Sequence, residues 1–274
     1  MTNVIVSYAR TPIGSFMGSL SSVSASNLGA FAIKSVIEKS NIDPNAIDQV
    51  IMGNVLSAGI GQAPARQASI YSGLSNLVDC LTINKMCGSG LQSIMIADQI
   101  ISSRPDKIII AGGMESMSQS PHYLMNSRKG VRLGEGKLVD GMIVDGLWDA
   151  YSDQHMGSCA EMCAEKFSIT RQEQDDYAIS SYKKSQQSLK DGFFSNEIVP
   201  VEVVKRREST FVENDEEPSR VLFEKIKHLK TEFNKDGTIT AGNASTINDG
   251  AAACLIMSKN KAKELGLNPI AEIV

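Results

Sequence analysis

The chain has 274 residues, of which 27 are basic and 31 acidic, so its formal net charge is −4 with the three histidines neutral. A typical domain has about 100–200 residues, and this length therefore fits one large domain or two smaller ones. The mild acidity argues against a protein whose main task is to hold nucleic acid or an anionic membrane, because both require a basic surface. We expect neither as a partner.

The cysteine content and the start of the chain indicate a reducing compartment. Five cysteines are scattered along the chain, an odd number for a disulfide framework. The first three residues run directly into a strand-like apolar stretch at 4–6, unlike a secretory leader. No apolar run approaches the ~18 residues of a membrane helix. We therefore expect a soluble protein with free thiols in the cytoplasm.

Short apolar runs alternate with helical patterns through the first 115 residues. The predicted strands lie at 4–7, 49–55, 80–84 and 107–111, and the predicted helices at 26–40, 64–73 and 90–102. Ser26 or Asn27 is expected to cap the first helix. This alternation is typical of an α/β sheet with crossover helices.

The composition changes near residue 118. The stretch 119–243 contains loops, charged helices such as 171–189, and few buried-strand runs, whereas an apolar run returns at 250–258. We therefore predict an α/β fold in two domains. A discontinuous domain of residues 1–118 and 244–274 holds a mixed sheet with crossover helices, and residues 119–243 form a domain inserted into it.

Cys87 lies where a predicted strand ends and a helix begins. The free N–H groups and the positive dipole end of a helix N-terminus favour a thiolate. Gly88 and Gly90 permit a tight turn and leave space beside the sulfur. The pattern is compatible with a nucleophile and, equally, with a core cysteine next to a structural turn.

A second segment, residues 235–252, has more small residues than an ordinary core segment. Such a stretch lets the backbone approach a ligand closely, with serine and asparagine side chains as hydrogen-bond partners. A tightly packed turn between the inserted and parent domains is the alternative, and by itself the segment favours that alternative.

Taken together, the motifs of this chain resemble those of thiolases, in particular the biosynthetic acetoacetyl-CoA thiolases. They stand at residues 9–14, 84–90, 111–118, 145–150, 155–157 and 240–252. The resemblance implies a thiolase-like N-terminal domain with an inserted loop domain. It also implies an acetyl-CoA C-acetyltransferase, which condenses two acetyl-CoA reversibly to acetoacetyl-CoA and CoA through an acetyl-cysteine at Cys87.

The resemblance also implies the ligand-binding residues. His155 and Met156 match the pocket around the thioester and favour a short acyl group. Ser245 matches the residue that hydrogen-bonds pantetheine, and Ala241 and Leu147 match residues that line the tunnel.

The resemblance further implies contacts to the nucleotide end of CoA and an assembly of several copies of the chain. Arg220 and Lys225 match the contacts to the nucleotide, and phosphates favour such cations. For Lys225, a solvated loop cation is an equally good interpretation. Residues 119–138 match a tetramerisation loop, so a dimer or homotetramer is expected. CoA thioesters are the substrates, and neither a cofactor nor a metal is expected.

The chain departs from the family in its catalytic motifs. Claisen chemistry requires a second cysteine and a histidine as acid, base and activating groups. In thiolases these lie in Cys-x-Gly-Gly-Gly and Gly-His-Pro motifs of a C-terminal domain, and neither motif occurs in the 274 residues. We therefore expect the C-terminal thiolase domain to be absent and the chain alone to be inactive or only partly active. An exposed apolar patch is expected on the helix 90–102, formed by Leu91, Ile94, Met95 and Ile101.

Three other interpretations fit parts of the sequence. A decarboxylating condensing enzyme also uses a cysteine at this place, but the His155-Met156 pair and residues 243–245 disfavour it. A CoA-binding or split-enzyme fragment that needs a separate C-terminal polypeptide stays open. A dinucleotide-binding fold is disfavoured because Gly88 and Gly90 lack the third glycine and the later acidic residue.

Overall fold

The computed structural model describes residues 2–205 and 208–274. The chain divides into two compact units. Unit 1 comprises Met1–Gln119, Asn196–Asn214 and Asn248–Val274, and unit 2 comprises Ser120–Ser195 and Asp215–Ile247. None of the helices in these described parts combines the length and the apolar character needed to cross a membrane.

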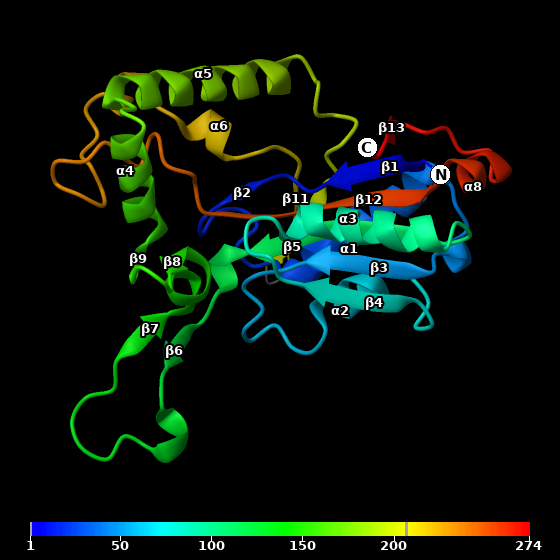
Figure 1. Cartoon of the computed structure of the whole chain (residues 1–274), viewed down its shortest axis with the longest axis horizontal. Helices are drawn as coiled ribbons and strands as arrows, with labels where there is room; N and C mark the ends of the chain where they lie inside the picture. The colour runs from blue at the N-terminus through cyan, green and yellow to red at the C-terminus, as the bar shows by residue number, and fades with distance from the viewer. Residues whose placement is uncertain (1, 206–207) are drawn as a thin grey trace. The chain divides into compact units, whose positions relative to one another are not determined.

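A seven-stranded mixed sheet forms the centre of unit 1 (Figure 1), in the order β13-β1-β12-β5-β3-β4 with β2 paired to β12. Strand β3 runs parallel to β4 and β5, whereas β12 runs antiparallel to β1 and β5. The strands are β1 (Asn3–Arg10), β2 (Gly14–Ser15), β3 (Gln49–Gly53), β4 (Asp79–Ile83), β5 (Ile108–Ser116), β12 (Asn248–Ser258) and β13 (Ala271–Glu272). The predicted mixed sheet is confirmed.

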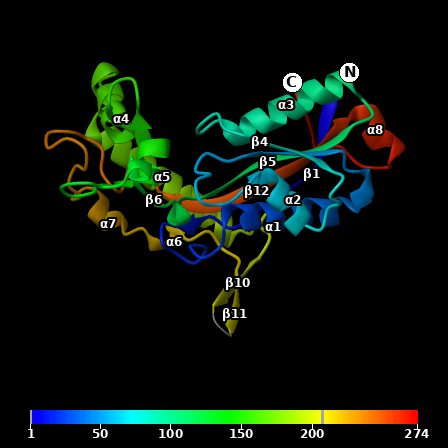
Figure 2. The same ribbon diagram turned by 90° about the horizontal axis from the view of Figure 1, so that it is seen from below.

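Helices cover both faces of this sheet. Helices α1 and α2 lie on one face and α3 on the other (Figure 2). Successive strand side chains point to opposite faces, so Val50 and Met52 pack towards α1 while Ile51 packs towards α3. The helices of unit 1 are α1 (Ala25–Ser40), α2 (Pro64–Tyr71), α3 (Ser89–Ser103) and α8 (Lys259–Glu264).

The N-cap of α1 is Ser24, not Ser26 or Asn27 as predicted. Its side chain accepts a hydrogen bond from the backbone N–H of Asn27. Ser26 is the second residue of the helix, where it is buried and its hydroxyl donates to the carbonyl of Pro64 at 3.3 Å. The capping function therefore belongs to the residue whose backbone is still extended.

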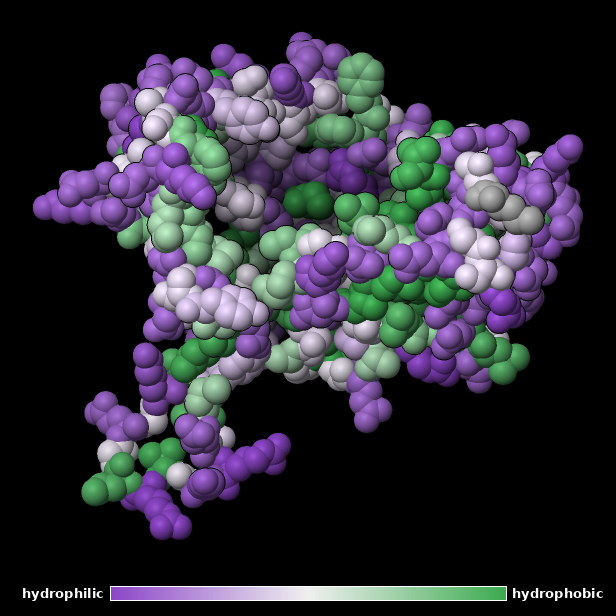
Figure 3. Space-filling model, viewed as in Figure 1, coloured by the Kyte–Doolittle hydropathy of each residue, from purple (hydrophilic) through white to green (hydrophobic). Residues whose placement is uncertain are grey.

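The apolar patch expected on α3 is smaller than predicted. Leu91 and Met95 are 67% and 45% exposed, and hydrophobic surface appears in Figure 3 on the face of unit 1 that carries α3. Ile101, however, is fully buried. It lies four residues after the buried Ala97, on the helical stripe that packs against the sheet.

Residues 196–214 were predicted to lie in the inserted domain, but they belong to unit 1. Glu197 pairs with Arg10 of β1 at 2.6 Å between Oε1 and Nε. Val201 and Val203 of strand β10 (Val201–Lys205), which forms a hairpin with β11 (Glu208–Val212), are buried in the core on the α1 side of the sheet. The two buried valines and the ion pair of Glu197 thus attach residues 196–214 to unit 1.

Unit 2 contains one long helix, several shorter ones and short strand pairs. Its strands are β6 (His122–Leu124), β7 (Leu138–Asp140), β8 (Trp148–Asp149) and β9 (Gln154–His155), and its helices are the π-helix at Ile143–Leu147, α4 (Met156–Lys166), α5 (Arg171–Lys190), α6 (Glu217–Arg220) and α7 (Phe223–Ile226). Thr170 and Glu173 form a complete capping box at the start of α5. The predicted charged helix at 171–189 is confirmed.

Candidate active site

The turn between β4 and α3 presents Cys87. Met86 has a φ of 49°, in the left-handed region that side chains disfavour. Two polar side chains stabilise this conformation. Asn84 Oδ1 accepts from the N–H of Met86 at 2.9 Å, and Ser89 Oγ accepts from the N–H of Lys85 at 2.8 Å while donating to the carbonyl of Met86 at 2.6 Å. Such side-chain bonds hold a strained backbone at a functional position.

Cys87 is exposed, which contradicts its interpretation as a core cysteine. It lies two residues before the first residue of α3, with Gly88 as the N-cap. Within unit 1 the thiol lines a cavity of about 320 Å³ together with glycines of three strands and of α3. The cavity is at the carboxyl ends of the parallel strands β3 and β5, the place where open α/β sheets bind ligands.

Glycines bring the start of α3 against the sheet backbone. A Cβ on Gly53 of β3 would lie 2.6 Å from the Cβ of Ser89, and one on Gly113 of β5 would lie 3.3 Å from the Cα of Gly90. Larger residues at these positions would push the helix away from the sheet. The close approach therefore places the Cys87 turn directly at the strand ends.

Glu115 is a carboxyl group of the same cavity that the sequence analysis missed. It accepts hydrogen bonds from the N–H groups of Val55 and Leu56 at 2.9 and 3.0 Å and from Asn54 Nδ2 at 2.9 Å. Burial raises the pKa of Glu115, although the two backbone N–H groups act in the opposite direction. The only signal in the sequence is an acidic residue directly after the apolar run 108–114.

The other cysteines differ from Cys87 in their surroundings. Cys80 and Cys254 are half-buried, and burial raises the pKa of each thiol. Cys159 is half-buried, and Cys163, four residues further along α4, is exposed. Among the described residues, no group of His, Cys, Asp or Glu side chains is arranged to hold a metal ion.

In unit 2, the predicted residue His155 is held from two sides. Its Nδ1 accepts from the N–H of Gly157 at 3.0 Å, which makes it the N-cap of α4. Its ring stacks on Phe233, with centroids 4.8 Å apart and an interplanar angle of 21°. A Cβ on Gly157 would lie 2.3 Å from the Phe233 ring, so the glycine makes room for this stack. Phe233 was missed because a lone aromatic residue in a polar loop carries no local signal.

The remaining predicted residues also lie in unit 2, whereas Cys87 lies in unit 1. Leu147 ends the π-helix and is half-buried, and Met156 is 41% exposed at the start of α4. The four positions predicted for the rest of CoA are exposed. Arg220 ends α6, Lys225 is in α7, and Ala241 and Ser245 lie in the loop before β12.

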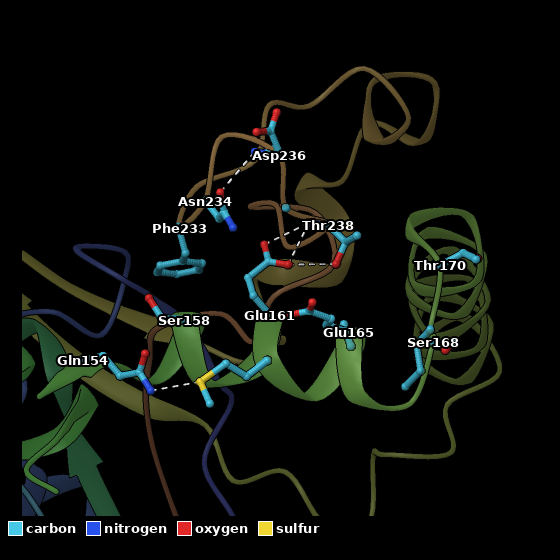
Figure 4. Close-up of a pocket in the computed structure, with 14 residues that line it drawn as sticks. Gln154, Ser158, Glu161, Glu165, Ser168, Thr170, Phe233, Asn234, Asp236 and Thr238 are labelled. Carbon is cyan, nitrogen blue, oxygen red and sulfur yellow. Dashed lines mark hydrogen bonds between the residues drawn. The ribbon is translucent and has the colours of Figure 1, made fainter. Parts of the chain in front are cut away.

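A large cavity of unit 2, about 730 Å³, includes none of the predicted residues. It lies between α4 and the loop 233–238 (Figure 4). Glu161 of α4 reaches across to Thr238 and Ile239, whose N–H groups donate to its carboxylate at 2.8–2.9 Å. With Glu165 and Asp236 also on its wall, the cavity is acidic and unsuited to the phosphates of CoA. The hydrogen bonds of Glu161 attach this loop to α4.

A mixed sheet layered between helices, with an exposed cysteine at the start of a helix, is the arrangement that the resemblance to thiolases predicts. The family described as "Thiolase, N-terminal domain" matches residues 3–260. The chain therefore belongs to the thiolase family.

Relatives agree over nearly the whole chain. Acetyl-CoA acetyltransferase 2 of Arabidopsis thaliana is 51% identical over 98% of this chain and 68% of its own length. A cytosolic acetyl-CoA acetyltransferase of Gibberella zeae is 48% identical, with the same two coverages of 98% and 68%. The Acat5 thiolase of Ascaris suum, solved in complex with coenzyme A, superposes with a TM-score of 0.94 at 43% identity, covering 100% of this chain and 70% of that one. The chain thus spans about two thirds of the length of its curated relatives.

Proposed function

We propose that this chain acts in acetyl-CoA acetyltransferase chemistry, the reversible condensation of two acetyl-CoA to acetoacetyl-CoA and CoA. The observation that carries the proposal is the exposed Cys87 at the start of α3, in a cavity lined by glycines at the strand ends. Identity of 51% to an acetyl-CoA acetyltransferase supports this chemistry over other cysteine chemistries.

Cys87 is the acyl acceptor in this proposal. Its thiolate attacks the carbonyl carbon of acetyl-CoA, a new sulfur–carbon bond forms, and the bond to the CoA sulfur breaks as CoA leaves as a thiolate. The helix start offers N–H groups to the negative charge that develops on the carbonyl oxygen, an interaction worth ~3–4 kcal/mol in comparable sites. In the second stage a carbanion of another acetyl-CoA attacks the acetyl carbon, a carbon–carbon bond forms, and the bond to the Cys87 sulfur breaks, which releases the Cys87 thiolate. We assign only the acyl-transfer stage to residues of this chain.

In this proposal, residues of unit 2 bind the CoA thioester. His155, oriented by Phe233, lies with Met156 beside the thioester and selects a short acyl group. Leu147, Ala241 and Ser245 contact pantetheine. Arg220 and Lys225 contact the nucleotide end, where two exposed cations suit phosphate groups. Acyl transfer between thioesters needs neither a redox cofactor nor a metal.

We further propose a homotetramer in the cytoplasm. The hairpin of β6 and β7 ends in exposed apolar residues, with Leu133 at 99% and Leu138 at 64% exposure. A solvated loop has no need of such side chains, so they suit a contact between copies. The cytosolic relative supports the location. In sedimentation velocity, L133D is expected to lower the association state, and an unchanged state would contradict the role of this hairpin.

The test of the chemistry is acetylation of the full chain by acetyl-CoA, followed by peptide mass spectrometry. We expect one acetyl group on Cys87, lost in C87S and kept in C80S. Acetylation at another residue, or none at all in a chain that binds CoA, would contradict the nucleophile. CoA binding without acetylation would favour the interpretation as a CoA-binding fragment.

A further inference from the structure

Asp175 is a buried carboxylate that the proposed chemistry does not use. It lies in the second turn of α5 and is only 2% exposed. A buried charge requires partners, because it has lost its hydration. Here Oδ2 accepts from Arg171 Nε at 2.8 Å and Oδ1 accepts from Asn243 Nδ2 at 2.9 Å. One oxygen of Asp175 therefore binds Arg171 of the same helix, and the other binds Asn243, which lies 68 positions away in the chain.

Asn243 passes this contact on to the loop 238–243. Its Nδ2 also donates to the carbonyl of Thr238 at 3.0 Å, and its Oδ1 accepts from the N–H of Thr240 at 2.8 Å. Because a carboxylate only accepts, Asp175 determines which side of the amide faces it. The orientation of the amide in turn sets the path of the backbone from Thr238 to Thr240, directly before Ala241.

Arg171 passes the contact on to a second segment. Its Nη2 donates to the carbonyls of Ile226 and Leu229 at 3.0 and 3.2 Å. This turn directly follows Lys225, and Ile226 itself is buried. Asp175 thus connects the segment proposed to contact pantetheine with the segment proposed to contact the nucleotide.

We propose that Asp175 is a positioning residue for CoA binding, because it holds the loop 238–243 through Asn243 and the turn 226–229 through Arg171. This inference rests on the proposed function. Two loops that are ordered before the ligand arrives lose less conformational entropy on binding. Removal of the carboxylate is expected to weaken the binding of CoA without changing the reactivity of the Cys87 thiol in unit 1.

The loop 238–243 has a second attachment that does not depend on Asp175, so substitution of Asp175 is expected to leave unit 2 folded. Glu161 of α4 binds the N–H groups of Thr238 and Ile239 and does not involve Asp175. The loop 238–243 therefore keeps one attachment when the network of Asp175 is broken. We expect the loop to become loose rather than the unit to unfold.

The test is D175N in the full chain, which preserves shape but replaces one acceptor by an N–H₂ group that faces a donor. CoA is titrated by calorimetry, and Cys87 is alkylated with iodoacetamide as a readout of unit 1. We expect Kd for CoA to rise at least tenfold, with unchanged alkylation and circular dichroism. The matched control is D176N, since Asp176 is exposed on the same helix and accepts a hydrogen bond from Gln172 of that helix at 2.7 Å. It is expected to leave Kd unchanged.

The outcomes separate the two proposals. Wild-type chain that does not bind CoA contradicts the proposed function, whatever the variants do. Wild-type chain that binds CoA, with folded D175N binding it as tightly as D176N does, overturns the positioning inference. If D175N does not fold, R171K decides, because it keeps the charge but loses the Nη2 bonds to Ile226 and Leu229. Unchanged Kd in folded R171K overturns the inference as well.

Discussion

Ser89 holds Met86 in the left-handed conformation that places Cys87 at the edge of its cavity. The Ser89 hydroxyl donates to the carbonyl of Met86 at 2.6 Å and accepts from the N–H of Lys85 at 2.8 Å. Ser89 itself is 4% exposed at the first position of α3. One buried hydroxyl thus links the helix to the turn before it, and the position of the sulfur depends on that link.

S89A is expected to slow acetylation of Cys87. It removes the hydroxyl that binds the Lys85 N–H and the Met86 carbonyl, although that carbonyl still accepts from the backbone N–H of Ser89. The Lys85 N–H left without its partner costs ~1–3 kcal/mol in stability. A displaced nucleophile loses up to ~10²-fold in rate. The acetylation rate is measured by mass spectrometry on samples quenched at successive times. The control is S103A, at the exposed far end of α3, and equal rates in S89A and wild type would contradict the role of the hydroxyl.

Alkylation with iodoacetamide near neutral pH is expected to modify Cys87 well before Cys80 and Cys254. Burial raises the pKa of the latter two, so a smaller fraction of each is thiolate at a given pH. Their rates are expected to increase as the pH rises above 9. Peptide mapping at several times and pH values measures this order. Modification of Cys254 as fast as Cys87 at pH 7 would be inconsistent with its burial.

The stability contributed by Glu161 is expected to depend on pH. Burial opposes ionisation of Glu161, but the N–H groups of Ile239 and Thr238 and the Thr238 hydroxyl outweigh it and lower the pKa of this carboxyl. A lowered folded-state pKa means that the contribution is present above the ordinary value of 4.5 and is lost as the pH falls through the folded value.

Urea unfolding of wild type and E161Q measures this contribution. We expect wild type to be more stable at pH 7 and the difference to shrink as the pH falls below 4.5, the ordinary pKa of the group. E165Q removes the same charge one turn further along α4 and is the matched control. A difference between wild type and E161Q that is independent of pH would argue against these hydrogen bonds.

G112A is expected to prevent folding of unit 1 or to destabilise it by ~4 kcal/mol or more. A Cβ on Gly112 would lie 2.0 Å from the carbonyl oxygen of Ala252, inside the pairing of β5 with β12. Neither central strand is free to move. G88A is the control, since a Cβ there would meet only the Lys85 carbonyl at 3.5 Å. Thermal unfolding by circular dichroism compares the two, and a G112A midpoint equal to that of G88A would refute the steric argument.

Local patterns predicted the helices well because their causes are local. The helices predicted at 26–40 and 171–189 are Ala25–Ser40 and Arg171–Lys190 in the structure. Their apolar spacing and capping residues lie within one or two turns of each other in sequence. The position of Cys87 between a strand and a glycine-rich helix start was predicted for the same reason.

Features that depend on distant partners were not predicted. In the sequence Glu115 is only an acidic residue at the end of a strand, and its contacts with residues 54–56 form on folding. Asp175 is one of several acidic residues of a charged helix, and its partner Asn243 lies 68 positions further along the chain. Ile101 was placed on the wrong side of its helix because only packing against the sheet distinguishes two apolar stripes.

The sequence by itself determined the class of fold, the family and the place of Cys87 between a strand and a helix, because periodicity, turn chemistry and motif spacing act over a few residues. Only the tertiary structure decided that 196–214 returns to the first unit, that Phe233 supports His155 and that Asp175 holds two loops. These arrangements consist of single contacts between segments far apart in the chain. Burial, which makes such contacts strong, exists only after the chain has folded.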